Sequence, residues 1–164
     1  MSAQTRYGFS TPIGSAGGII DIAPYAIDTF LNDAENGTMK FGMGVVEGSV
    51  PGKSITVPTA GATADKFEGV TVNNRTTEYD IDGALSLHKN VSVGVMRYGR
   101  IYVRVAKDAQ PTYGDAMYLI VDGDEAGYFT SDAGSNIAVK GRFMSSVDST
   151  SGVAMAEIFN QAQV

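Results

Sequence analysis

The sequence predicts an all-β protein: a small, glycine-rich β-barrel or sandwich with an extended N-terminal arm. Twenty glycines and only 18% charged residues in 164 positions are unusual for a helical protein and favour short strands joined by turns. Short apolar runs recur at intervals of about 8–12 residues, the spacing typical of barrels and sandwiches. No stretch keeps the i, i+3, i+4, i+7 pattern of an amphipathic helix.

The stretch 91–121 is the centre of this prediction. In residues 100–105, Ile101, Val103 and Val105 alternate with polar or amphipathic residues, so the two sets face opposite sides of a strand. Residues 110–115 (QPTYGD) have turn chemistry, and 116–121 (AMYLIV) read as a second strand. Two strands around a turn are not stable alone, so the rest of the chain must supply their partners.

Residues 1–35 are predicted to form the arm, and 36–164 the barrel body. Glycines and prolines interrupt every possible element of the arm, yet it carries more large apolar residues than a disordered tail. Ordering its backbone costs about 1–2 kcal/mol per residue, so the arm needs a large surface to lie on. That surface is either the protein's own barrel or a neighbouring subunit. Residues 26–32 are predicted to form a short helical turn.

Further strands are predicted along the body, and the last of them is expected to pair with an early one. Residues 74–87 are irregular and are interpreted as an excursion across the barrel surface. The predicted strands cover residues 40–46, 53–57, 66–72, 128–130, 136–144 and 152–159.

Candidate chemical groups are few, and each has a simpler structural explanation. His88 is the only histidine and has no second histidine or cysteine to complete a metal site. Glu78, Asp80 and Asp82 share one face of a strand, but a solvated face before a glycine turn explains them better than a cation or acid–base site. The run from Asp122 to Glu125 lacks the later ligands of a calcium loop. We therefore predict no enzyme activity, no cofactor and no metal.

Composition excludes further classes. A net charge of −6 disfavours nucleic acid as a direct partner, since phosphate binding needs a basic surface. No apolar run approaches a membrane span, and residues 1–10 lack the apolar region of a signal peptide. Because there is no cysteine, the fold must be held by packing rather than by disulfides.

Charge is distributed unevenly. Residues 83–107 contain five basic residues and no acid, whereas 21–47 contain five acids and one lysine. Arg100 and Arg104, with Tyr102 between them, form a patch suited to an acidic protein partner or a polyanion. Two alternatives stay open: the protein's own carboxylates neutralise this patch, or acidic and basic segments of neighbouring copies meet head to tail.

Four segments resemble the structural cement, or capsid decoration, proteins of tailed bacteriophages, and the resemblance covers roughly residues 40–164. The glycine-rich arm is also similar to the ends of such proteins. These are structural strand and turn motifs, so they imply no active site. The segments are 113–119 (YGDAMYL), 127–130 (GYFT), 139–143 (VKGRF) and 153–161 (VAMAEIFNQ).

The resemblance implies a protein made in the host cytoplasm that binds the outer surface of the phage head. There it would bridge neighbouring major capsid subunits and stabilise the shell, as a homo-oligomer in which a trimer is favoured over a dimer. The alternative is a virion surface module that recognises carbohydrate or another receptor through Tyr98, Tyr102, Tyr113 and Tyr128. The residues expected to bind partners are Tyr7, Phe9, Ile13, Ile19, Ile20, Ile22, Arg100, Tyr102 and Arg104.

Overall fold

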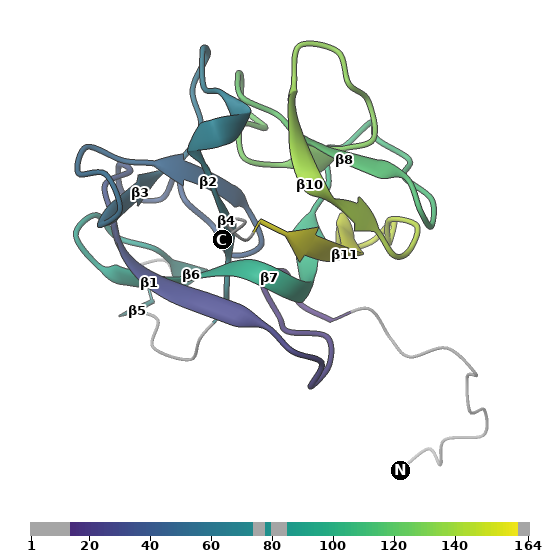
Figure 1. Cartoon of the computed structure of the whole chain (residues 1–164), viewed down its shortest axis with the longest axis horizontal. Helices are drawn as coiled ribbons and strands as arrows, with labels where there is room; N and C mark the ends of the chain where they lie inside the picture. Colours follow the sequence, from purple (N-terminus) through teal and green to yellow (C-terminus); the bar gives the residue numbers. More distant parts are fainter. Residues whose placement is uncertain (1–13, 74–77, 80–84, 161–164) are drawn as a thin grey trace.

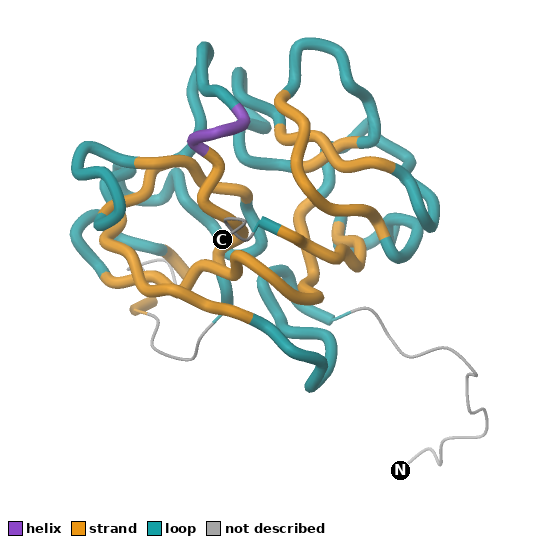
Figure 2. Tube along the Cα trace, in the orientation of Figure 1, coloured by secondary structure: helices purple, strands orange, loops and turns teal. Residues whose placement is uncertain are grey.

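The computed structural model describes residues 14–73, 78–79 and 85–160, and their regular structure is almost entirely β (Figures 1 and 2). The prediction of an all-β fold is therefore confirmed. Within these residues the only helix is a single 3-10 turn, η1 (Ala64–Lys66), and no helix is long and apolar enough to cross a membrane. The strands are β1 (Ala26–Asn32), β2 (Gly44–Glu47), β3 (Ser54–Thr56), β4 (Phe67–Thr71), β5 (Glu78–Tyr79), β6 (Leu85–Ser86), β7 (Ser92–Arg104), β8 (Ala116–Leu119), β9 (Phe129–Thr130), β10 (Ile137–Phe143) and β11 (Val153–Phe159).

The first half of the chain closes into a five-stranded barrel. Its strands follow the order β1-β3-β2-β4-β7, and β7 pairs again with β1 to complete the ring. The pairing of β1 with β3 is parallel, with Leu31 opposite Ser54, while the other pairs are antiparallel. Closure leaves little exposed edge on these strands, which limits a common route to aggregation.

Strand β7 joins the barrel to the second half of the molecule. Its first part pairs with β1 and β4, and its second part pairs with β11 over residues 98–104. The sheet continues from β11 through β10 and β8 to β9, and an isolated bridge between Val105 and Phe129 returns β9 to the end of β7. Figure 1 shows β7 running beneath both halves.

Gly99 lies where β7 passes from one half to the other. Its φ of 128° is a conformation that side-chain-bearing residues rarely adopt, and a Cβ at this position would lie 2.7 Å from the Cβ of Tyr25. Glycine here thus allows both the change in strand direction and the close approach of the segment that precedes β1.

One apolar core spans both halves. It includes Val70 and Met96 from the barrel together with Phe129, Phe143 and Ile158 from the second half. The Phe67 and Phe129 rings meet edge to face, with centroids 6.5 Å apart, across the junction. A second cluster fills the barrel beside β1, β2 and β3. Since the main cluster is continuous, the two halves pack as one unit.

Residues 26–32 form a strand, so the prediction of a helical turn there is wrong. Six consecutive residues of this segment pair with β7, and Phe30 and Asn32 point into the interior. The β-branched and aromatic residues of the segment suit a strand, and the β7 edge satisfies its backbone groups. Part of the segment assigned to the arm therefore belongs to the barrel wall, while the division of the chain into arm and body stays a prediction.

The last strand, β11, pairs with β7 and β10 rather than with an early strand, although the Asn160 side chain does donate a hydrogen bond to the Phe67 carbonyl at 2.7 Å. The predicted excursion over residues 74–87 contains the short β5–β6 pair and otherwise lies largely outside the described residues.

The junction core is open to a direct test. Phe129→Ala removes a fully buried ring and is expected to lower the free energy of unfolding by about 3–5 kcal/mol. Phe159→Ala is the matched control, because this ring is 41% exposed and its loss should cost about 1 kcal/mol. Urea unfolding measures both values. Equal losses for the two variants would contradict a core that spans the junction.

Candidate functional site

Residues 14–22, here called the strap, lie along the middle of β7. The Gly17 N–H donates to the Tyr102 carbonyl at 2.8 Å, the Tyr102 N–H donates to the Gly18 carbonyl at 3.0 Å, and Ile19 bridges Ile101. Over residues 98–104, β11 pairs with one edge of β7. The strap pairs with the other edge, which is the edge that β1 occupies over the first part of the strand. The strap therefore continues the line of β1, separated from it by a turn that projects outward.

Tyr102 lies beneath the strap. It is only 8% exposed and clusters with Ala16 and Val153, and Ile20 packs against the same group. A Cβ on Gly14 would overlap the Tyr102 ring, so the glycine lets the strap backbone lie directly on the aromatic face. The surface of β7 that the sequence predicts to bind a partner is thus covered here by the protein's own N-terminal segment.

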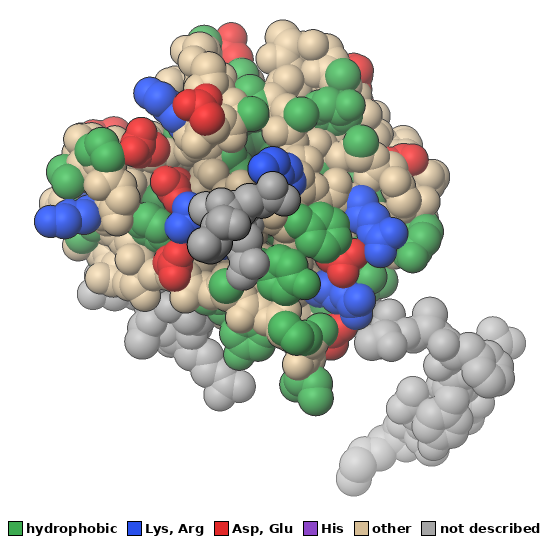
Figure 3. Space-filling model, viewed as in Figure 1, with side chains coloured by type: hydrophobic (Ala, Val, Ile, Leu, Met, Phe, Trp, Pro, Cys, Tyr) green, Lys and Arg blue, Asp and Glu red, His purple; other side chains and the backbone are tan. Residues whose placement is uncertain are grey.

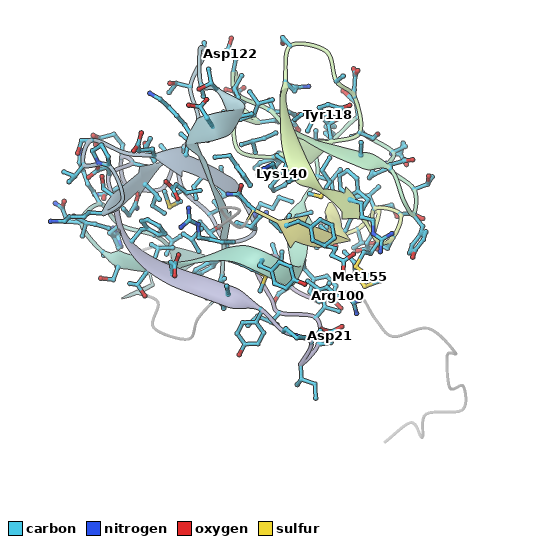
Figure 4. The ribbon with its side chains drawn as sticks, viewed as in Figure 1. Asp21, Arg100, Tyr118, Asp122, Lys140 and Met155 are labelled. Atoms are coloured by element: carbon cyan, nitrogen blue, oxygen red, sulfur yellow. The ribbon has the colours of Figure 1, made fainter. Side chains whose placement is uncertain are left out.

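An ion-pair network fixes the far end of the strap. Arg100 contacts Asp21 at 2.9 Å and Glu157 at 3.2 Å, and Glu157 contacts Arg142 at 2.9 Å. Figure 4 shows Asp21 and Arg100 side by side near the turn. The Arg142 guanidinium in turn lies 5.9 Å from the centre of the Tyr113 ring. The network links the strap, β7, β10 and β11.

This network shifts the ionisation of its members. The pKa of Asp21 is lowered because Arg100 donates a hydrogen bond to its carboxylate and the Ala23 N–H donates another. The pKa of Arg100 is raised, mainly by its hydrogen bond to Asp21 and then by that to Glu157. Both side chains are about one-third exposed, so solvent and salt screen their attraction.

The other basic residues of β7 and the segment before it are also paired within the chain. Arg97 contacts Asp28 and Glu68, and Lys89 contacts Glu35. Arg104 donates from Nε to the Phe41 carbonyl at 2.8 Å. The structure therefore contains the first of the two alternatives for the uneven charge: the protein's own carboxylates pair with its basic residues.

The predicted arm residues lie in different environments. Within the strap, Ile20 is partly buried against Tyr102 and Val153, Ile19 is 38% exposed, and Ile22 at the outward turn is fully exposed. Tyr7, Phe9 and Ile13 lie outside the described residues.

The exposed isoleucines belong to a larger apolar surface that the sequence analysis missed. Tyr25 is 51% exposed and rests on Gly99, and the Phe159 ring lies 6.2 Å from that of Tyr98. Ile19, Ile22, Tyr25 and Phe159 are here called the apolar ridge. Figure 3 shows hydrophobic side chains gathered over β11 and the turn before β1, beside the charged network.

The sequence gives only a weak signal for this ridge. Tyr25 and Phe159 come from the two ends of the chain, and both lie beside the same part of β7 because β1 and β11 pair with opposite edges of that strand at Tyr98. The remaining tyrosines of the carbohydrate-binding alternative do not gather. Tyr113 packs beneath Arg142, Tyr102 is buried, and Tyr128 lines a cavity elsewhere.

The candidate chemical groups do not assemble into a site in the part of the chain that the structure describes. No group of three or more His, Cys, Asp or Glu residues there is placed to hold a metal ion. The backbone carbonyl of His88 accepts a hydrogen bond from the Asn32 side chain. Glu78 begins β5, while Asp80 and Asp82 lie outside the described residues.

A family model described as structural cement protein (E217 gp24/Pam3 gp6), a phage family, matches residues 3–159. The match includes the strap, β7 and the whole apolar ridge. The chain belongs to the phage structural cement protein family. It is thus a structural protein of the phage capsid, as the resemblance predicts.

A solved structure supports the fold of this cement protein. A chain from "The capsid of Myoviridae Phage XM1" superposes with a TM-score of 0.71 and 24% sequence identity, covering 98% of the present chain and 99% of that chain. No curated protein matches. The two chains therefore share their architecture over almost their full length.

The strap of the cement protein depends on Gly17, which gives a second test. Its φ is 78°, and a Cβ would lie 2.8 Å from the Asn73 nitrogen and 2.9 Å from the Thr71 oxygen. Gly17→Ala is expected to detach the strap and to speed hydrogen exchange of the Tyr102 amide at least roughly tenfold. Exchange followed by NMR measures this effect.

Gly37→Ala is the control for that experiment. Gly37 has nearly the same φ, 79°, but its Cβ would meet no described atom within 4 Å. The Gly37→Ala variant should therefore lose some stability from alanine at a positive φ, but its strap should stay attached. Equal acceleration of Tyr102 exchange in both variants would contradict the proposed attachment.

The third test is the pH dependence of the strap. A carboxyl whose pKa is lowered on folding stabilises the fold above its unfolded pKa and loses this contribution as the pH falls through the folded value. Since the pKa of Asp21 is below 3.8, attachment should be constant from about pH 7 to 5 and weaken below about pH 4. The Ile20 amide resonance should follow this titration, because Ile20 donates to the Arg100 carbonyl.

Asp21→Asn is the reference for the titration. Its Ile20 resonance should lack the acid step, while resonances near Asp33 and Asp148, whose pKa values are also lowered, should titrate in both proteins. An identical Ile20 titration in the two proteins would exclude Asp21 as its cause.

Proposed function

We propose that this cement protein binds the outer surface of the phage head, bridges neighbouring major capsid subunits and stabilises the shell. The observation that carries the proposal is the apolar ridge, an exposed hydrophobic surface held in a fixed position by the strap and its ion pairs. Exposed apolar groups of this kind, bordered by polar residues, are typical of protein interaction sites. Membership of a structural cement family favours a capsid subunit as the partner.

The ridge is suited to anchoring a partner. Ile22 at the tip and Tyr25 behind it offer side chains whose burial is worth about 1.5–3 kcal/mol each. Because the strap and β1 fix the turn at both ends, little conformational entropy is lost on binding. Many modest contacts repeated over a capsid lattice would then give strong retention through avidity.

A second apolar spot supports bridging rather than a single contact. Leu31 is 40% exposed and Val50 is 48% exposed, and both lie beside the β2–β3 turn, near the far end of β1 from Tyr25. At about 3.3 Å per residue, the length of β1 separates the two surfaces by roughly 20 Å. One protein could therefore contact two neighbouring subunits.

In this proposal the predicted partner-binding residues have two roles. Ile19 and Ile22 contact the capsid directly, and Tyr7, Phe9 and Ile13 of the arm extend the contact surface. Ile20, Arg100, Tyr102 and Arg104 act indirectly, because their contacts hold the strap and the segments around it in place. We also propose a homo-oligomer, with a trimer favoured over a dimer.

Co-sedimentation with expanded, undecorated heads tests the proposal. Deleting residues 1–35 would remove β1 and open the barrel, so point variants are preferable. Ile22→Asp and Val50→Asp place a charge on each apolar surface and should each weaken binding roughly 10- to 100-fold. Ser135→Asp adds the same charge in the exposed β9–β10 loop and should bind like the parent protein.

Heat-induced DNA release from decorated heads distinguishes bridging from attachment. The parent protein should raise the release temperature at saturation, whereas a variant that binds through one surface only should not. Saturable binding with no gain in shell stability would contradict bridging. Failure of the parent protein to bind intact heads would overturn the proposed function as a whole.

A further inference from the structure

The edge of β1 that faces away from β7 is only partly paired. Successive residues of a strand direct their N–H and carbonyl groups to opposite edges, and in β1 the groups of Leu31 face β3. The Leu31 N–H donates to the Lys53 carbonyl at 2.9 Å, whereas the Lys53 N–H donates to the Val50 carbonyl, because the chain turns there. Figure 1 shows β3 beside only the far end of β1.

Ile27 and Thr29 direct their backbone groups to the same edge, where the described part of the chain offers them no partner. A hollow of about 350 Å³ opens beside Thr29, and its lining includes Gly52, Glu68 and Arg97. The Thr29 side chain is itself exposed. Two N–H donors and two carbonyl acceptors are therefore available to an added strand.

The core holds this edge in its extended shape. Phe30 is buried in the barrel, Ile27 packs against the main core cluster, and residues 26–31 pair with β7 along the other edge. Because the edge is already extended, a partner strand would bind it without first having to order it. Extended peptides bind strand edges of this kind through main-chain hydrogen bonds.

Exposed apolar side chains lie at both ends of the unpaired edge. Tyr25 of the apolar ridge precedes it, and Leu31 and Val50 lie beyond its other end. The hollow between them is lined by the ion pairs of Arg97 with its two carboxylates. A segment added to this edge would therefore meet apolar side chains at its ends and a polar surface at its middle.

A second copy of the chain is a poor partner for this edge. The antiparallel register that uses all four backbone groups places Thr29 opposite Ile27 of the other copy, and it sets the two Asp28 side chains directly opposite each other. Like charges in that position are destabilising. Arg97 contacts Glu68 as well as Asp28, so it does not offset both carboxylates.

We propose that an extended segment of a major capsid subunit joins β1 as a further strand along residues 27–29. The inference rests on the proposed function and names the main-chain contact through which the capsid is bound. Membership of the cement family favours a capsid subunit over other partners. A segment that passes along β1 also runs from one exposed apolar surface towards the other, which is the direction of the proposed bridging.

Hydrogen exchange of the full chain, free and bound to expanded heads, tests the inference. In the free protein the Ile27 and Thr29 amides should exchange quickly, whereas the Asp28 and Phe30 amides, which face β7, are the protected reference. On decorated heads the Ile27 and Thr29 amides should exchange at least roughly tenfold more slowly. Protection of these two amides in the free protein, or unchanged exchange on the heads, would overturn the inference.

Thr29→Pro gives an independent measurement. It removes the N–H that faces the unpaired edge, and a strand tolerates proline where no partner strand uses that N–H. The variant should bind heads at least roughly tenfold more weakly in co-sedimentation. Thr29→Val is the matched control, since it keeps the N–H and the side-chain shape and should bind like the parent. Both variants should keep the parent far-ultraviolet circular dichroism spectrum.

The outcomes separate this inference from the proposed function. Parent-like binding by a folded Thr29→Pro protein, together with weakened binding by Ile22→Asp, would overturn strand addition and leave the apolar ridge as the capsid contact. Failure of the parent protein to bind heads would overturn both.

Discussion

The structure depends on the backbone of β7, whose hydrogen-bonding groups require partners on both edges. The strand runs from Ser92 to Arg104 through the centre of the molecule, and burial would make each unpaired N–H or carbonyl costly. Strand β1 and the strap take one edge, while β4 and β11 share the other. Barrel closure, the second half of the sheet and the order of the N-terminal segment are all consequences of this one requirement.

The same requirement connects the fold to the proposed binding surface. The strap is attached by backbone hydrogen bonds and by burial of Tyr102, and Arg100 attaches its far end through Asp21. The outward turn between strap and β1 is thus fixed at both ends. An apolar tip on a flexible tail would lose conformational entropy whenever it bound, and this turn avoids most of that loss.

The fold class can be predicted from the sequence, because the alternation of apolar and polar residues along a strand is a local pattern. Ile101, Val103 and Val105 are all buried, as their period of two indicates. The parallel pairing of β1 with β3 joins Leu31 to Ser54 and is not encoded in any local pattern. The strand conformation of residues 26–32 likewise depends on the edge of β7, which is distant in sequence, so the local sequence wrongly predicts a helical turn there.

The site was less predictable than the fold. The pattern around Arg100, Tyr102 and Arg104 predicts a strand face that binds a partner, and in the structure the strap covers Tyr102 on that face. Which groups cover that face depends on Asp21 and Glu157, which come from opposite ends of the chain. The ridge has the same origin, because Tyr25 and Phe159 are brought to the same part of β7 only by the pairing of β1 and β11 with that strand.

The ion pairs and the exposed apolar side chains of the ridge respond differently to salt. The Asp21–Arg100 pair is partly exposed, so salt weakens it, but the backbone hydrogen bonds of Gly17, Gly18 and Ile20 do not depend on long-range charge. Burial of the ridge is not screened by salt and is strengthened by salts that are excluded from protein surfaces. The proposed capsid contact through the ridge relies on this apolar burial, so it is expected to persist as the ionic strength rises.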